Sequence, residues 1–240
     1  MLKNLPENIQ PILTTGRILH SAKSVFQQNG LYPQAVFPLP GVFMNGGVAY
    51  KPGEILTVHH TFPAHIRSEL MELSQNFQKT AFVFFALTQV YLVNPTPFSM
   101  QVSKSHYLNV QISTGQDLPQ EIVKLMILED HPEKLSAIQK EAIMIEGEKA
   151  YTVSTAFEIN PTGINKANTL KTLLKQLEWE DCSVVTVGDA ENDLALFEIA
   201  DLCFAPTTAY TSVLEKADHV IPREKEGLLM PILKEMKSIQ

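Results

Sequence analysis

The sequence predicts an α/β protein built on a Rossmann-like parallel sheet and carrying an inserted α+β segment. After Pro161, short apolar runs alternate with amphipathic stretches, which is typical of βαβ units around a parallel sheet. Residues 1–48 show the same α/β pattern, with polar residues just past a strand end, whereas the middle of the chain has a mixed α+β pattern. We therefore predict one domain from residues 1–48 and 160–240, with an inserted α/β domain over 49–159.

The first segment and the insert are assigned from periodicity and from Pro and Gly positions. Ile18, Ala22 and Phe26 have helical spacing that stops at Gly30, and Pro63 opens an amphipathic helix. The expected elements are a strand over Asn8–Arg17 ending in a turn, a helix over Ile18–Asn29, a strand–turn–strand unit over 35–50, a strand over Glu54–Thr61, a helix over Phe62–Phe77, strands over Phe82–Val93, a strand or short helix over Gln120–Leu128, a helix over Pro132–Ile143 and a strand over Tyr151–Ile159.

The last segment alternates between the two element types. Apolar leucines at helical spacing mark the first helix, and short β-prone runs mark the strands. The expected elements are a helix over Lys166–Leu177, a strand over Ser183–Val187, a helix over Asp193–Ala200, a strand over Leu202–Ala205, a helix over Ser212–Ala217, a strand over His219–Ile221 and a helix over Gly227–Met236.

Composition narrows the class of protein. The chain has 240 residues, of which 45% are hydrophobic, and a net charge of −7, which argues against nucleic acid or an anionic membrane as the main partner. No long apolar run opens the sequence, and the longest, AFVFFAL, is too short to span a bilayer. We therefore expect a cytoplasmic protein in a reducing compartment.

Cysteine and histidine carry no predicted chemistry. Cys182 and Cys203 lie in or beside apolar runs without metal or disulfide spacing, so we expect buried thiols in strands. His59 and His60 are adjacent on a strand and would face opposite sides. His106, His131 and His219 are interpreted as surface or edge residues.

Three polar side chains follow the buried strand Ser183–Val187. Gly188 allows a tight exit, Asp189 stands at the strand's carboxyl end, and Asn192 and Asp193 fall where the next helix starts. Capping of backbone N–H groups alone would explain Asp193. However, three oxygen-bearing groups within five residues exceed what a cap requires, and hard oxygen ligands suit Mg²⁺.

Two further turns indicate an anion site. Thr14-Thr15-Gly16-Arg17 places hydroxyl and N–H groups where a strand runs into a helix, although plain turns often share this composition. Lys166 stands at a helix start, where its charge opposes the local dipole. A bound anion would explain this lysine, and a solvated surface lysine is the simpler alternative.

Together, these motifs resemble the haloacid dehalogenase-like superfamily, in particular its Cof-type phosphatases. The runs EINPTGINKANTLKTLL, VVTVGDAENDLALFEIAD and ADHVIPREKEGLLMPIL match the family in order and spacing. The GD-x-x-ND pattern with its upstream lysine is the specific signal. TTGR at 14–17 resembles the family's Thr-Gly-Arg turn, and NGG at 45–47 its Asn-Gly step before the cap. The resemblance is specific over residues 155–235 and loose elsewhere.

The resemblance implies a Mg²⁺-dependent phosphatase of small phosphorylated metabolites such as sugar phosphates. Thr15 would hold a phosphoryl oxygen and Lys166 would neutralise the phosphate. Asp189 would ligate Mg²⁺ with Asp193 beside it, and Asn192 would help to orient the site. The insert would be the family's cap. The implied substrate contacts are Thr14, Thr15, Gly16, Arg17, Asn45, Gly46, Lys166 and Asn192.

The chain departs from the family at its first motif. The family's Asp-x-Asp-Gly-Thr supplies the nucleophile and the general acid–base from a central strand. This chain has no D-x-D, and its first aspartate is Asp117. We therefore expect a truncated form that lacks about 30 residues, has little activity, and carries two unpaired sheet edges, with association of chains through such an edge.

Two other readings stay open from the sequence alone. One is a catalytically dead binding or scaffold protein of the same fold, with the cap as its interaction surface. The other is an unrelated α/β binding domain in which the polar loops are only caps.

Overall fold

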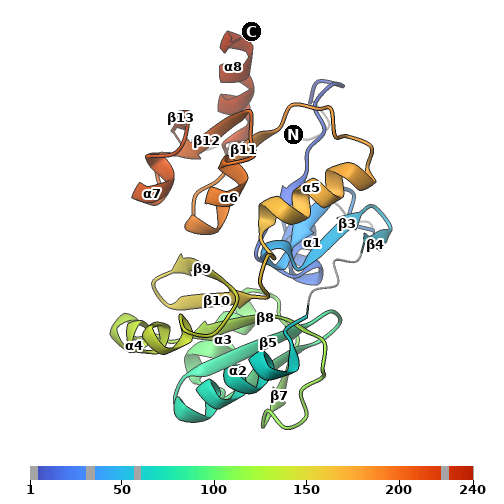
Figure 1. Cartoon of the computed structure of the whole chain (residues 1–240). Coiled ribbons are helices and arrows are strands. Elements are labelled where there is room, and N and C mark those ends of the chain that lie inside the picture. The colour runs from blue at the N-terminus through green and yellow to red at the C-terminus, as the bar shows by residue number, and fades with distance from the viewer. Residues whose placement is uncertain (1–4, 31–35, 57–60, 223–226, 240) are drawn as a thin grey trace. The chain divides into compact units, whose positions relative to one another are not determined.

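The computed structural model describes residues 5–30, 36–56, 61–222 and 227–239 (Figure 1). The chain divides into two compact units, Met1–Leu177 and Glu178–Gln240. The division of the chain into residues 1–48 with 160–240 and an insert over 49–159 stays a prediction.

The first sheet of unit 1 has four strands in the order β1-β2-β3-β4. β1 (Leu13–Thr14) runs parallel to β2 (Gly41–Phe43), whereas β3 (Val48–Lys51) and β4 (Glu54–Leu56) continue the sheet antiparallel. Helix α1 (Leu19–Gln28) follows β1 and ends before Gly30, whose φ of +66° a helix cannot continue. β1 is an edge strand of this sheet.

The second sheet of unit 1 has six strands in the order β7-β6-β5-β8-β10-β9. All neighbours are antiparallel except the parallel pair β6–β7. The strands are β5 (Ala81–Ala86), β6 (Val90–Val93), β7 (Val110–Ser113), β8 (Ile122–Leu128), β9 (Glu148–Val153) and β10 (Ala156–Asn160).

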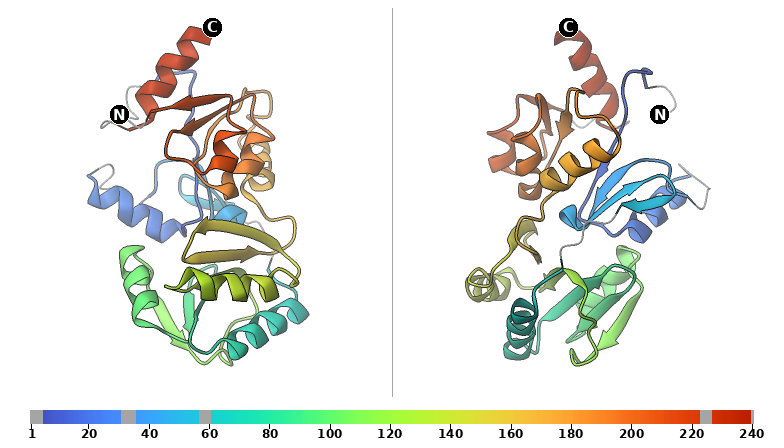
Figure 2. Two further views of the ribbon diagram at one scale, coloured as in Figure 1. Left: turned by 90° about the vertical axis from the view of Figure 1, so that its left-hand side faces the viewer. Right: turned by 45° about the vertical axis from the view of Figure 1, so that its right-hand side comes forward.

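Alternate residues of β5 pack into two different cores. Phe82 and Phe84 join a cluster with residues of α2 (Ala64–Asn76) and α4 (Pro132–Ala142), which lie on one face of the sheet (Figure 2). Val83 and Phe85 join a second cluster that includes Phe43 from β2, Met44, and side chains of α3 (Pro97–Ser105). This second cluster is a continuous apolar core between the two sheets of unit 1.

Several elements of unit 1 differ from their predictions. The strand expected over Tyr151–Ile159 is a hairpin of β9 and β10, because a turn at Ser154-Thr155 breaks it without glycine or proline. Gln120–Leu128 is strand rather than helix over Ile122–Leu128. Helix α3 and strand β7 were not predicted. The strand expected over Glu54–Thr61 is described only to Leu56, since 57–60, with His59 and His60, lie outside the described residues.

Helix α5 (Lys166–Gln176) closes unit 1 and matches the predicted helix within one residue. Asn165 caps it, since its side-chain Oδ1 accepts a hydrogen bond from the Asn168 N–H at 2.9 Å. The helix contacts β2, β3 and the 3₁₀ turn η2 (Met44–Gly46). Its first turn therefore lies beside η2.

Unit 2 has a parallel three-stranded sheet in the order β11-β12-β13. The strands are β11 (Val185–Val187), β12 (Leu202–Pro206) and β13 (His219–Ile221), and the connecting elements are η3 (Glu191–Asp193), α6 (Leu194–Phe197), α7 (Thr211–Leu214) and α8 (Leu229–Ile239). The predicted alternation is present, although two helices are shorter than expected. β11 is an edge strand of its sheet.

The two cysteines have different environments. Cys203 is buried in β12, as expected, and its thiol donates to the Asp218 carboxylate at 3.0 Å. Cys182 is exposed, which corrects the prediction, because β11 begins only at Val185 and leaves Cys182 in the preceding loop. Within the described residues, no helix has both the length and the apolar character needed to cross a membrane.

Candidate active site

The Thr14–Arg17 turn and η2 are tied together by backbone hydrogen bonds. The Asn45 N–H donates to the Thr15 carbonyl at 3.2 Å, and the Met44 N–H donates to the Arg17 carbonyl at 3.0 Å. The Thr15 N–H donates to the Val42 carbonyl at 2.9 Å, which extends the β1–β2 ladder to the turn. The predicted phosphate turn is therefore held as a unit with the Asn-Gly step.

Two glycines of the site are fixed by close approach. A Cβ on Gly16 would lie 2.8 Å from the Asn45 Oδ1, so a larger residue at this position would displace the Asn45 side chain. Gly46 has a φ of +114°, and a Cβ there would lie 2.4 Å from the Asn165 carbonyl oxygen. The Thr169 hydroxyl donates to the Gly46 carbonyl at 2.7 Å, which ties η2 to helix α5.

The side chains of the Thr14–Arg17 turn make local contacts. The Arg17 N–H donates to Thr15 Oγ1 at 3.2 Å, so the hydroxyl proton of Thr15 can be donated to a further acceptor. The Arg17 guanidinium donates to Ser21 Oγ at 3.1 Å. Burial lowers the pKa of Arg17 from its ordinary value, although arginine stays charged at neutral pH.

Lys166 is the first residue of α5 and is 4% exposed. The solvated-lysine alternative is therefore wrong. A buried ammonium at a helix N-terminus works against both desolvation and the dipole. Any anionic group that contacts the ammonium, from the protein or from a ligand, offsets both costs.

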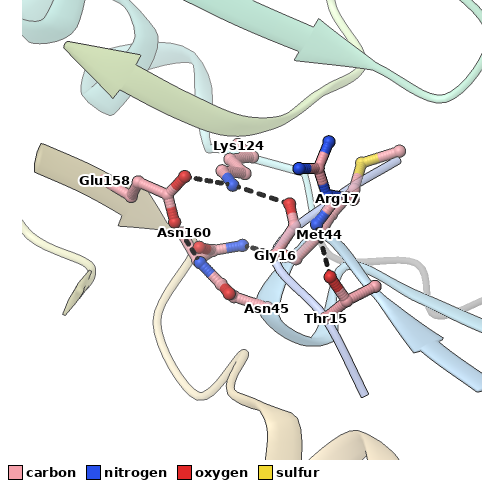
Figure 3. Close-up of polar contacts among 8 residues, drawn as sticks. All are labelled: Thr15, Gly16, Arg17, Met44, Asn45, Lys124, Glu158 and Asn160. Carbon is pink, nitrogen blue, oxygen red and sulfur yellow. Dashed lines mark hydrogen bonds and ion pairs between the residues drawn. The ribbon is translucent and has the colours of Figure 1, made fainter. Parts of the chain in front are cut away.

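A buried polar network that the sequence analysis missed adjoins the turn (Figure 3). The Lys124 Nζ lies 2.6 Å from the Glu158 Oε1 and donates to the Gly16 carbonyl at 2.9 Å. The Asn45 Nδ2 donates to the Glu158 Oε2 at 2.5 Å. Burial lowers the pKa of Lys124, while the Glu158 carboxylate opposes that shift and the charge of Lys166 adds to it. The ammonium groups of the two lysines are thus close enough to interact.

The predicted acidic motif of unit 2 folds back on itself. The Asp193 Oδ2 accepts hydrogen bonds from the Asp189 N–H at 3.1 Å and from the Ala190 N–H at 3.4 Å. A Cβ on Gly188 would lie 2.5 Å from the Asp193 Cβ, so this glycine is required by close approach. Part of the Asp193 carboxylate therefore has the capping role that the sequence also allowed.

The donor set of this motif fits a magnesium ion in its chemistry. Asp189, Asn192 and Asp193 offer carboxylate and amide oxygens, which hard divalent cations prefer. Among the described residues, the one set of three His, Cys, Asp or Glu with ligand atoms within 4.8 Å of one another is Glu129, Asp130 and His131. A magnesium ion at the motif would thus draw further ligands from elsewhere or from water.

The structure brings the predicted site residues together in two groups. Unit 1 gathers the Thr14–Arg17 turn, Asn45 and Gly46, with Lys166 on the adjoining helix. Unit 2 gathers the acidic residues of 189–193. The convergence of the loops at Thr15, Lys166 and Asp189 on one ligand stays a prediction.

Comparison with known proteins decides the family. Residues 1–230 match the family model of haloacid dehalogenase-like hydrolases. The chain belongs to this family. A solved structure from Streptococcus mutans UA159 matches with a TM-score of 0.80 at 18% identity, over 98% of this chain and 89% of that one. A sugar phosphatase of haloacid dehalogenase subclass IIB matches with a TM-score of 0.74 at 15% identity, over 96% and 85%. These likenesses confirm the predicted α/β fold with a Rossmann-like core and a cap.

Relatives of the haloacid dehalogenase-like chain include named phosphatases. A Streptococcus pyogenes protein, provisionally named a phosphatase, is 27% identical over 205 residues, which cover 80% of this chain and 72% of that protein. A phosphoglycolate phosphatase of Methanothermobacter thermautotrophicus is 26% identical over 177 residues, which cover 73% and 66%. The matched region thus spans about two thirds to three quarters of these relatives' lengths.

Proposed function

We propose that this haloacid dehalogenase-like chain belongs to a Mg²⁺-dependent phosphatase of small phosphorylated metabolites, with sugar phosphates as the favoured class. The observation that carries the proposal is the Thr14–Arg17 turn, which is hydrogen-bonded to η2, together with the buried Lys166 on the helix that contacts η2. It offers a hydroxyl, backbone N–H groups and a cation, which together suit a phosphoryl group. The named sugar phosphatase among the structural neighbours supports the substrate class.

Each residue has a role that its position supports. The Thr15 hydroxyl would donate to a phosphoryl oxygen, and the Lys166 ammonium would neutralise the charge of the phosphate. Asp189 and Asp193 would hold Mg²⁺ with Asn192 orienting them, and the ion would supply charge neutralisation when bound. Arg17, Thr14 and Asn45 would contact the substrate from the turn and from η2.

We propose that the 240-residue chain turns over slowly on its own. Phosphoryl transfer in this family needs an aspartate nucleophile and a neighbouring acid–base, and this chain contains no D-x-D pattern. The chain therefore offers groups that bind phosphate and metal, without the group that attacks phosphorus.

We propose a small metabolite rather than a nucleic acid or membrane as the partner, since the net charge is −7.

Strands β1 and β11 are each at a sheet edge, which supports association of chains through such an edge. A dimer in analytical ultracentrifugation that dissociates after a lysine is placed in β1 or β11 supports this, and a strictly monomeric chain overturns it.

The decisive experiment is titration calorimetry of inorganic phosphate with and without Mg²⁺. We expect Mg²⁺-dependent binding that Lys166→Met and Asp189→Asn each weaken roughly tenfold or more. The matched controls are Lys171→Met, an exposed lysine of the same helix, and Asp181→Asn, an exposed acid of unit 2, which should bind as the parent does. Equal binding by Lys166→Met and Lys171→Met would overturn the site. Rapid hydrolysis of an aryl phosphate by this chain would overturn its slow turnover.

A further inference from the structure

Lys124 and Glu158 are an almost completely buried ion pair outside the proposed reaction. Their side chains are 1% and 7% exposed, and their charged atoms lie 2.6 Å apart. A buried pair of this kind is weak evidence for stability, since apolar residues of similar volume are often as stable or more so. The contacts that the pair makes with other elements therefore matter more than the pair itself.

These contacts are directed at the two turns of the candidate site. Lys124 in β8 faces Phe85 across the ladder and donates to the Gly16 carbonyl at 2.9 Å. Glu158 in β10 accepts from the Asn45 amide at 2.5 Å. Two residues further on the same strand, Asn160 donates to the Met44 carbonyl at 2.8 Å (Figure 3). Thus β8 and β10 of the second sheet hold turns that belong to the first sheet.

The Lys124 contact fixes the direction of one peptide group. A trans peptide is planar, so its C=O and N–H point in opposite directions. When the Gly16 carbonyl points to the Lys124 ammonium, the Arg17 N–H points away from it and reaches Thr15 Oγ1 at 3.2 Å. The orientation of the Thr15 hydroxyl thus depends on the lysine through the peptide between residues 16 and 17.

The Glu158 contact fixes a residue in an uncommon backbone conformation. Asn45 has a φ of +57°, and its Oδ1 lies 2.8 Å from where a Cβ on residue 16 would be. Asparagine tolerates this region better than most residues, although the conformation still needs support from its surroundings. Glu158 supplies that support by fixing the amide end of the side chain.

We propose that Lys124 and Glu158 are positioning residues, which orient the Thr15 hydroxyl and Asn45 for a bound phosphoryl group. This inference rests on the proposed phosphatase function. Burial lowers the pKa of Lys124, while the carboxylate of Glu158 opposes that shift and so helps to keep the donor in its ammonium form. The pair therefore needs both charges to hold the turn.

Amide hydrogen exchange of the full chain, followed by mass spectrometry, tests the positioning directly. In Lys124→Met, exchange of segments 13–17 and 43–47 should accelerate roughly 10-fold to 100-fold, since a charge-assisted hydrogen bond is lost. The double variant Lys124→Met/Glu158→Met removes both charges and should fold with little loss of thermal stability. Its amide exchange at both segments should nevertheless be as fast as in Lys124→Met. Glu158→Gln keeps one acceptor, so its exchange rates at both segments should lie between those of the parent and those of Lys124→Met.

The matched control is Lys149→Met, a lysine of β9 in the same sheet. Its ammonium also donates to backbone carbonyls, those of Ile145 and Gly147, away from the site. This variant should change exchange at 13–17 and 43–47 less than about twofold. If Lys124→Met and the double variant leave both segments as protected as in the parent, or no more exposed than in Lys149→Met, the inference is overturned.

A second arm repeats the exchange with Mg²⁺ and inorganic phosphate. Phosphate should protect segment 13–17 in the parent and in Lys149→Met, but not in Lys124→Met. Absence of phosphate protection in the parent would count against the proposed function, while the exchange without phosphate still decides the positioning role. The two failures can therefore be told apart.

Discussion

Gly46 is the point where the candidate phosphate turn meets the helix that carries Lys166. We predict that Gly46→Ala destabilises the protein and displaces the start of α5. The substitution places a methyl group 2.4 Å from the Asn165 carbonyl oxygen, at a φ of +114°. Since Asn165 is the N-cap of α5, relief of the overlap moves the residue that directly precedes Lys166.

The expected magnitude has two parts. A non-glycine residue in this region of φ costs about 1–3 kcal/mol. The overlap with a backbone atom adds about 1–3 kcal/mol, as for other overpacked sites. The control Gly53→Ala isolates the first part, because Gly53 has a φ of +89° and its Cβ would meet nothing within 4 Å. Gly46→Ala should therefore be less stable than Gly53→Ala by roughly 1–3 kcal/mol.

Urea denaturation followed by circular dichroism measures both free energies of unfolding, and calorimetry with phosphate measures binding. Gly46→Ala should also lose phosphate affinity, whereas Gly53→Ala should keep it. Equal free energies for the two variants would refute the steric argument. Full phosphate binding by Gly46→Ala would refute the link from η2 to the helix.

Two further predictions concern charge and metal. Glu158→Gln should cost about 3–5 kcal/mol at pH 7, because it leaves the Lys124 ammonium buried beside Lys166 without its carboxylate. Burial lowers the pKa of Lys124 below its unfolded value, and loss of the Glu158 carboxylate lowers it further in the variant. The unfolded state therefore binds more protons than the folded variant, so the stability of the variant rises with pH, and its deficit should shrink between pH 7 and pH 10 in urea titrations. A constant deficit would contradict this. Gly188→Ala places a methyl group 2.5 Å from the Asp193 Cβ and should weaken Mg²⁺ binding about tenfold by calorimetry, while unchanged affinity would separate Asp193 from the metal.

Elements with strong local signals were predictable from the sequence. Helix α1 has apolar residues at helical spacing and a glycine stop, and α5 has its leucines and an Asn cap, so both were found within a residue or two. Helix α3 was not predicted, although its start carries a local signal. In fact Thr96 and Ser99 form a capping box with Pro97 at the first helical position, which is a recognisable helix start.

The candidate site was predictable where its residues follow strand ends. Thr15 follows β1 and Asp189 follows β11, and both strands belong to parallel pairs, in which polar groups gather at the carboxyl ends of the strands, whereas Lys166 comes after the antiparallel strand β10. The burial of Lys166 could not be predicted, because a lysine at a helix start is solvated in most proteins. This burial results from tertiary packing, in which α5 contacts β2, β3 and η2.

Lys124 and Glu158 show that a single charged residue within an apolar strand carries information about its surroundings. Each is the single charged residue of an apolar strand, IVKLMIL for β8 and AFEIN for β10, and such residues are rarely buried unless they are paired. Two lone charges of opposite sign in two buried strands therefore predict that the strands are neighbours and that the charges meet. The sequence does not say what else the pair would hold, since the Gly16 carbonyl and the Asn45 amide lie 108 and 113 positions away from it along the chain. That second set of contacts, rather than the pair itself, gives the two charges their proposed part in the site.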